Sequence, residues 1–409
     1  MKIMSIMIFS LIFLMASCHK EDTIPSDPPV VAKPIFEKVW STRIYDAPKE
    51  NVGSSNAYLY KDMYVVTGNG YNIPDPKLYI FDTKTGIKKF EIKQTGKYQV
   101  PGYNLIGKDK IVVISDAKGI AAYDIESRSL LWEEVHTDKN ELGLVGQLPI
   151  YGNHVYKGIS IGSFDGPAKM IRYNLFSGEK DELITIPIND KWSPQFSPPT
   201  FFVNEKKDTI MLFIDSKNNV NFGPLSSPTD LIAYNITKKR MQWTIKNVME
   251  VGTNTLSPPV VFENTVIFGG DWSIYSVDIL TGKVKWRKEF LELAKVGNFN
   301  STGLLLVNDK VFANPDVFDI FCLNAKDGST IWHKKDAPNC SPKMLHNDGM
   351  LITSSFGLGS VLIYDLENGN LIHKEKSSNN YNIDVLYDAE SNMYFVQDFA
   401  QAVGFKINK

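Results

Sequence analysis

The sequence predicts an all-β protein: an eight-bladed β-propeller of four-stranded antiparallel blades, closed by pairing of its N- and C-terminal strands. Two observations lead to this fold class. One unit of about 42 residues recurs about eight times between Pro34 and the C-terminus, and each unit contains four short apolar runs separated by polar turns. Repeats of this length with four strands each are typical of propeller blades, which bury both sheet faces against their neighbours.

The clearest copy of the unit spans residues 273–286, where an alternating strand leads into an Asp-x-x-Thr-Gly turn and a second strand. Trp286 stands eight residues after Asp278. The equivalent turn residues are Asp82, Asp124, Asn174, Asn235, Asp278, Asn324, Asp365 and, in a truncated last copy, Lys406. A β-sandwich of loosely similar strands would not keep the distance from turn to aromatic fixed. We therefore expect an array of blades.

Each repeated residue has a structural explanation. Glycine four residues after the Asp suits a tight hairpin that needs positive φ, and the Asp or Asn side chain can accept hydrogen bonds from turn amides. The aromatic residue at the end of the unit can wedge between blades, where its indole N–H finds a partner. We assign these tryptophans to the scaffold: Trp40, Trp132, Trp243, Trp286 and Trp332.

The two ends of the chain complete one another. The last unit supplies three strands, and residues 36–44 read as a lone fourth strand with Trp40 as its aromatic. Together they make the eighth blade, which removes the open sheet edge that a lone three-stranded unit would leave. We therefore expect a single propeller domain over residues 35–409, although the length alone would suggest two or three domains.

The units resemble the PQQ-like propeller repeat, named after pyrroloquinoline quinone, over nearly all of the chain beyond the first 34 residues. Residues 278–286 match its Asp-x-x-Thr-Gly and Trp fully, residues 82–86 and 324–332 nearly, whereas Ser127-Arg128 and Lys238-Lys239 depart from Thr-Gly. The resemblance implies one of two functions. Quinoprotein dehydrogenases share this fold with lipoproteins that do no chemistry, such as the propeller component of the outer-membrane barrel-assembly machinery.

The N-terminal segment differs from the repeats. Lys2 precedes an apolar run over residues 3–15, and Met15-Ala16-Ser17-Cys18 resembles a lipobox, whose cysteine is lipidated. We predict a lipoprotein signal peptide over residues 1–17 and, from its polar and proline-rich composition, a disordered tether over residues 18–34. The lipid on Cys18 would then anchor the protein in the bacterial outer membrane, on its periplasmic or surface side. An uncleaved anchor is the alternative interpretation.

No motif in the chain is typical of catalysis. The six histidines lack metal-ligand spacing, and haem-attachment, nucleophile-elbow and phosphate-loop motifs are missing. Cys322 and Cys340 are not the adjacent cysteine pair of many quinoprotein alcohol dehydrogenases, and a disulfide between them stays an open question. The net charge of -2 with dispersed Lys and Arg predicts no nucleic-acid partner. We expect neither a cofactor nor a metal, and favour a protein without enzymatic activity.

Loop length singles out one face of the ring. Turns between first and second strands and between third and fourth strands are short, and nearly all extra length falls on the opposite side. This long-loop face comprises residues 68–76, 136–146, 186–196, 216–230 and 290–301. Binding sites usually lie on loops of a rigid scaffold. Our candidate binding residues there are Trp192, Asp271 and Trp272, unless the two tryptophans fold inward over the channel mouth.

Three functional hypotheses follow, of which we favour the first. It is a lipid-anchored envelope scaffold that binds other envelope proteins through the long-loop face. The second is a quinoprotein-type dehydrogenase that oxidises an alcohol or sugar with PQQ and calcium, for which the only regular acidic set is Asp116, Asp165, Asp215 and Asp271. The third is a surface glycan-binding lipoprotein, with Trp192 and Trp272 stacking on sugar rings.

Overall fold

The computed structural model describes residues 35–44, 56–67, 76–95, 104–116, 119–136, 141–143, 148–161, 167–189, 192–219, 227–252, 258–270, 273–290, 303–314, 319–335, 340–355, 360–376, 382–398 and 401–408. The predicted signal peptide, Cys18 and the predicted tether lie outside these residues. Residues Ile35–Lys409 form one compact unit. Within the described ranges, no helix is long and apolar enough to cross a membrane.

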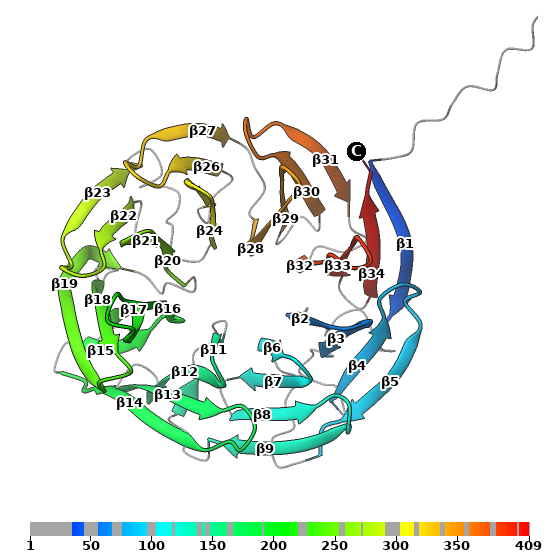
Figure 1. Cartoon of the computed structure of the whole chain (residues 1–409), viewed down its shortest axis with the longest axis horizontal. Coiled ribbons are helices and arrows are strands. Elements are labelled where there is room, and N and C mark those ends of the chain that lie inside the picture. Colours follow the sequence, from blue (N-terminus) through cyan, green and yellow to red (C-terminus); the bar gives the residue numbers. More distant parts are fainter. Residues whose placement is uncertain are drawn as a thin grey trace, which may run out of the picture. The chain divides into compact units, whose positions relative to one another are not determined.

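Eight antiparallel sheets arranged in a ring confirm the predicted propeller (Figure 1). Blades one to three are β2(Ala57–Tyr60), β3(Met63–Thr67), β4(Lys77–Asp82) and β5(Lys88–Lys93); β6(Asn104–Lys108), β7(Ile111–Asp116), β8(Gly119–Asp124) and β9(Ser129–Val135); β10(Glu141–Gly143), β11(Ile150–Tyr151), β12(His154–Ile161), β13(Ala168–Asn174) and β14(Lys180–Ile186). Blades four and five are β15(Trp192–Phe196), β16(Thr200–Val203), β17(Thr209–Asn219), β18(Ser227–Asn235) and β19(Arg240–Gly252); β20(Val260–Phe262), β21(Thr265–Gly270), β22(Ser273–Asp278) and β23(Val284–Glu289). Blades six to eight are β24(Leu304–Val307), β25(Lys310–Ala313), β26(Asp319–Asn324) and β27(Thr330–Lys335); β28(Cys340–Asn347), β29(Met350–Ser355), β30(Ser360–Asp365) and β31(Leu371–Lys376); β32(Asn382–Asp388), β33(Met393–Asp398), β34(Gln401–Ile407) and β1(Phe36–Arg43).

The eighth blade is closed by the two ends of the ring, because β1 pairs antiparallel with β34 from Phe36 opposite Ile407 to Arg43 opposite Gln401. In Figure 1 the two strands lie side by side in blue and red. The hydrophobic core is divided into eight clusters, and each cluster is shared by two neighbouring blades. Stability therefore depends on the contacts between adjacent sheets.

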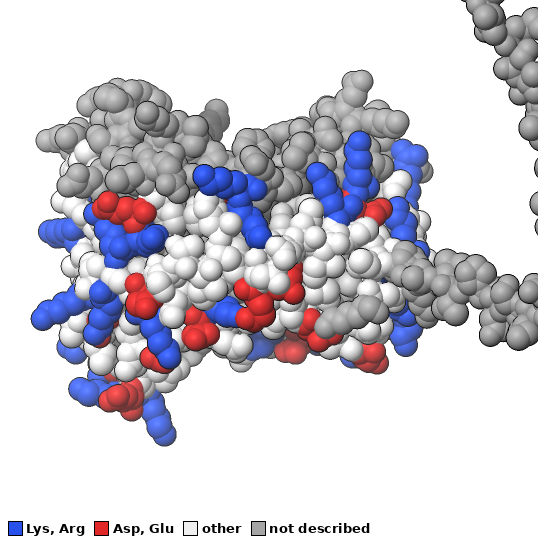
Figure 2. Space-filling model, turned by 90° about the horizontal axis from the view of Figure 1, so that it is seen from above, with Lys and Arg blue, Asp and Glu red and all other residues white. Residues whose placement is uncertain are grey.

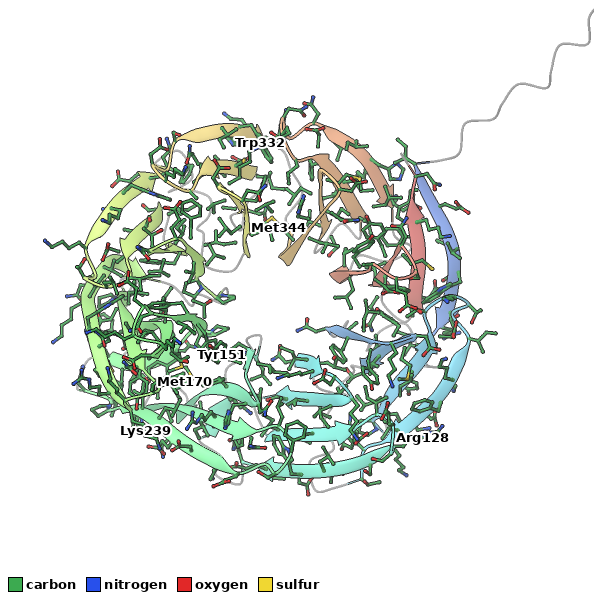
Figure 3. All side chains as sticks on the ribbon, in the orientation of Figure 1. Arg128, Tyr151, Met170, Lys239, Trp332 and Met344 are labelled. Carbon is green, nitrogen blue, oxygen red and sulfur yellow. The ribbon has the colours of Figure 1, made fainter. Side chains whose placement is uncertain are left out.

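The repeated tryptophans share one kind of hydrogen bond, which each of them makes with the next blade. Each indole N–H donates to the carbonyl of the residue after that blade's turn Asp or Asn, at 2.7–3.1 Å. The pairs are Trp40 with Thr83, Trp132 with Leu175, Trp243 with Ile279, Trp286 with Ala325 and Trp332 with Leu366. Figure 3 shows Trp332 where blades six and seven meet. These contacts connect consecutive blades.

The turn Asp holds its hairpin as the sequence suggests. Oδ1 of Asp278 accepts the backbone N–H of Leu280 and of Thr281, at 3.1 and 2.8 Å, and the Thr281 hydroxyl at 2.8 Å. Burial alone would raise the pKa of Asp278, but the hydrogen bonds from Thr281 and the Lys285 ammonium outweigh it and lower that pKa. The carboxylate that organises the turn thus stays ionised at neutral pH.

Cys322 lies on β26, fully buried, and carries a free thiol. Burial raises the pKa of this thiol to about 12, which makes it a small apolar side chain of the core rather than a reactive group. The side chain of Cys340, at the start of β28, lies outside the described residues.

Candidate functional site: the extended end of blades three and four

Blades three and four each carry a fifth strand where the other blades have four, because the innermost strand is split in two. In blade three, β10 and β11 both pair with β12. In blade four, β15 and β16 both pair with β17, which is 11 residues long, and the outer strand β19 is 13 residues long. The outer strands of the other blades have six to eight residues. Both sheets therefore extend on the long-loop face.

Trp192 is the first residue of β15, so the link between blades three and four that we predicted as a loop is partly a strand. Its Cα lies opposite Asn219 of β17. Trp192 N–H donates to Asn189 Oδ1 at 2.8 Å, and the Trp192 carbonyl accepts the Asn189 N–H at 3.1 Å. The side chain is half-buried. Trp192 is thus the first paired residue at the end of β15 that lies farthest from the short turns.

Strand β15 is held from both sides. Phe196 is buried and packs edge-on against Phe213 of β17, with ring centroids 4.9 Å apart. Just beyond the strand, the Ser197 hydroxyl accepts the Ile214 N–H at 2.9 Å. Strand β15 also contacts β12 and β13 of blade three. Strand β15 is therefore packed into the ring and connects blades three and four.

A group of polar side chains connects strands β17, β18 and β19 where blade four is extended. The Lys217 ammonium lies 2.7 Å from Oδ2 of Asp230, and both side chains are largely buried. Oδ1 of Asp230 accepts the Asn247 N–H at 2.7 Å, where β19 bulges and Asn247 takes a φ of 50°. Bulges redirect a strand. Here the bulge lets β19 continue to Gly252 instead of ending where the neighbouring outer strands do.

Asp215 lies beside this group, directly opposite Asp230 in the pairing of β17 with β18. It is 1% exposed, and its Oδ1 accepts the Gln195 N–H at 3.2 Å. Burial raises the pKa of Asp215 to about 7, with the Asp230 charge adding to the rise and Lys217 opposing it. Without a bound metal cation this carboxyl group is thus partly protonated at neutral pH.

The remaining predicted site residues lie outside the described structure. Asp271 and Trp272 fall there, as do Asp165 and the side chain of Asp116, together with much of the loop sequence that defines the long-loop face. In the described ranges, no three His, Cys, Asp or Glu side chains are placed to hold a metal ion. The described candidate site is thus the strand framework beneath those loops.

A buried pair between blades two and three was not predicted. Lys157 on β12 is 1% exposed, and its ammonium lies 2.9 Å from the Gly119 carbonyl and 3.1 Å from Nε2 of His136. Burial and the Lys157 charge lower the pKa of His136 to about 4, so this imidazole is neutral. His136 follows Trp132 by four residues, as Phe290 follows Trp286, and Phe290 is also buried. His136 therefore occupies the position in blade two that the apolar Phe290 occupies in blade five.

Comparison with known proteins agrees with the repeat. Residues 225–335 match the family described as outer membrane protein assembly factor BamB. The crystal structure of BamB from Moraxella catarrhalis aligns with 91% of this chain and 99% of its own, at a TM-score of 0.60 and 11% identity. The chain thus has the β-propeller fold, and residues 225–335 match the PQQ-like repeat family.

Other solved structures share the fold of this PQQ-like propeller. Quinohemoprotein alcohol dehydrogenase from Comamonas testosteroni aligns with 91% of the chain and 76% of its own, at a TM-score of 0.65 and 8% identity. Sqt1 from Saccharomyces cerevisiae aligns with 91% of the chain and 100% of its own, at a TM-score of 0.68 and 12% identity. No curated protein matches the sequence. At such identities the likeness is one of fold, and function must be argued from the site.

Proposed function

We propose that this protein is a non-enzymatic scaffold of the bacterial cell envelope, anchored by a lipid on Cys18, which binds another envelope protein at the extended end of blades three and four. The match to the BamB family supports an envelope location and a binding role. The likeness to dehydrogenases is one of fold alone, at 8–12% identity.

The observation that carries this proposal is the length of β19. In the described part of the chain, β19 is the last strand of its sheet, and its distal part, residues 248–252, runs beyond the bulge at Asn247. The outer edge of such a strand offers backbone N–H and C=O groups to an added strand. An extended segment of a partner would pair along β19, with Trp192 as an aromatic contact across the same sheet.

Site-specific photo-cross-linking in cells tests this proposal. A photoreactive residue replaces Trp192 or Val251 in the extension, and Val203 or Met241, both well exposed in blade four, in the controls. We expect one envelope protein to be cross-linked from positions 192 and 251 and not from 203 and 241. Adducts of equal yield from all four positions, or no adduct from any, would contradict the proposed docking site.

A further inference from the structure

The outer strands of the propeller differ in charge around the ring. Those of blades five to eight, β23, β27, β31 and β1, carry nine Lys and Arg and three Glu. Those of blades one to four, β5, β9, β14 and β19, carry six basic and six acidic residues. The whole chain is slightly acidic. The net positive charge of the outer strands thus lies on the half formed by blades five to eight.

The same half of the rim exposes most of its large apolar side chains. They are between 39 and 52% exposed and comprise Ile35, Val39, Val284, Ile331, Leu371 and Ile372. Among the described side chains of the outer strands of blades one to four, Leu131 and Met241 are exposed at a comparable level, and Ile87, which directly precedes β5 as Ile35 precedes β1, is 68% exposed. Exposed apolar side chains are ordinary when scattered. On four consecutive blades, among basic residues, they form a surface of one kind, which we call the basic rim.

Strand alternation explains the exposure of Ile331 and Val39, whereas Leu371 and Ile372 are consecutive residues beside the register shift between Ile363 and Tyr364. Along an outer strand alternate residues face opposite ways. On β27 Trp332 is buried against blade seven, and its neighbour Ile331 is 43% exposed. On β1 Trp40 is buried and Val39 is exposed. Figure 2 views this side of the ring, where basic and acidic side chains are interspersed among uncharged atoms. The repeat therefore fixes apolar and basic side chains on one outer surface.

The place where the preceding chain joins the ring also lies in the basic rim. Ile35 is the first residue of the compact unit and is itself exposed. The 34 residues before it contain the apolar run at 3–15 and Cys18. If the proposed lipid anchor exists, it attaches beside this rim. The basic rim is therefore the part of the ring nearest to that attachment point.

We propose that the part of the basic rim formed by blades six to eight lies on an anionic lipid bilayer, so that the ring stands on its edge. Apolar side chains would enter the headgroup region, and lysines would extend their ammonium groups to lipid phosphates. The orientation rests on the proposed anchor, whereas the contact itself follows from the surface. A second copy of the chain is the less suitable occupant, because it would bring basic surface against basic surface.

Hydrogen–deuterium exchange of the full-length protein tests the contact. The protein is reconstituted with vesicles of phosphatidylcholine, with or without phosphatidylglycerol. Because the anchor would act on both vesicle types alike, it is the anionic lipid that reports on the rim. We expect exchange of β27, β31 and β1 to slow at least threefold with phosphatidylglycerol, and that of β9 and β14 to stay unchanged.

Two exposed double variants make the test specific. Ile331→Ser with Leu371→Ser should abolish the slowing, and Leu131→Ser with Met241→Ser, changed at similar exposure on the opposite half, should preserve it. Equal slowing in β9 and β14, no slowing anywhere, or slowing without vesicles that grows with protein concentration would each overturn the proposal. Cross-links from positions 192 and 251 do not depend on this contact. Failure here is therefore distinguishable from failure of the proposed function.

Discussion

At the scale of single residues, the tryptophan of one blade decides which residue fits in the next. A Cβ added at Gly328 would lie 2.6 Å from Cε3 of Trp286, and the same clash recurs at Gly86, Gly178 and Gly369 with the preceding blade's tryptophan. Each of these glycines also has a φ near +70°. The Thr-Gly signature thus answers two demands, a left-handed turn and an indole resting on it.

These two demands can be separated with Gly328→Ala and Gly349→Ala. Both glycines have positive φ, 71° and 75°, but a Cβ at Gly349 meets nothing within 4 Å. We expect Gly349→Ala to cost about 1 kcal/mol for left-handed backbone alone. Gly328→Ala should cost a further 1–3 kcal/mol, roughly, for overpacking against Trp286. Denaturant unfolding of both variants measures the difference, and equal midpoints would show that the indole imposes nothing.

A second residue-scale prediction concerns pH. Because the pKa of Asp215 is about 7 in the folded protein and near 4 when unfolded, its protonated form stabilises the fold fully below pH 4, and this contribution is lost as pH rises to 7. The loss is at most roughly 4 kcal/mol. Asp230 and Lys217 face the group, and Asn keeps an acceptor for the Gln195 N–H. Asp215→Asn should therefore gain thermal stability relative to the wild type between pH 4 and 7.

His136 works in the opposite direction over the same pH range. With its pKa lowered to about 4, it favours the fold above pH 6.5 and loses that contribution as pH falls toward 4. The pH profile of the wild type is the sum of both groups, so only the difference from Asp215→Asn isolates the carboxyl. A melting-temperature difference that does not change from pH 4 to 7 would exclude a raised pKa for Asp215.

At the scale of elements, the two blades whose turn has a basic residue in place of the glycine also contact the preceding blade through that residue. Blade two has Arg128 in place of glycine, and its guanidinium lies 4.0 Å from the ring centre of Phe90 in blade one. Blade four has Lys239, which pairs with Asp181 of blade three at 3.1 Å. Figure 3 shows both basic residues at the outer edge of the ring. Where the motif lacks glycine, the residue in its place therefore makes a specific contact with the preceding blade.

The coupling predicts a double-mutant result. Phe90→Trp alone should destabilise by about 1–3 kcal/mol, because the larger ring collides with Arg128. With Arg128→Gly added, the indole can rest on a glycine turn and donate to the Ile125 carbonyl, as the other tryptophans do in their blades. We expect a favourable coupling energy of about 1–2 kcal/mol in urea unfolding. Strict additivity of the two changes would contradict the Trp–Gly rule.

Strand β15 shows where the sequence was a poor guide to elements. Asn189 to Ser193 reads as a polar link, and Pro194 argues against a central strand. The segment nevertheless pairs with β17, because it is an edge strand, where proline is tolerated. Its pairing depends on the unusual length of β17, which no local pattern of residues 186–196 reveals. The Lys157–His136 pair was missed for a similar reason, since a lysine within a strand ordinarily indicates an exposed face.

At the scale of the whole molecule, the blade count could be predicted because it depends on spacing, whereas the site could not. Seven turn residues, the equivalent Lys406 in the last unit and a lone N-terminal strand suffice to predict eight blades, and all are visible without tertiary contacts. Ligand recognition depends instead on loops with no repeat to align. The basic rim lies between these cases, because each outer strand could be aligned but its exposure required the structure.

Closure of the ring gives the last prediction, since β1 holds the two ends of the chain together. Trp40 is buried, donates to the Thr83 carbonyl at 2.8 Å and covers both Gly86 of blade one and Gly404 of blade eight. Removing residues 19–44 would take away this side chain and expose the edge of β34. Loss of one large buried aromatic costs roughly 3–5 kcal/mol, a sizeable part of a domain's stability.

Removing residues 19–34 alone should leave stability nearly unchanged, if they are the tether that their composition predicts. Thermal melts of the two truncations and of Trp40→Ala measure these effects. We expect Trp40→Ala to lie between the truncations, because it loses the aromatic contact but keeps the strand pairing. Equal melting temperatures for the two truncations would mean that β1 adds nothing to closure, and that the ring is held by its seven complete blades alone.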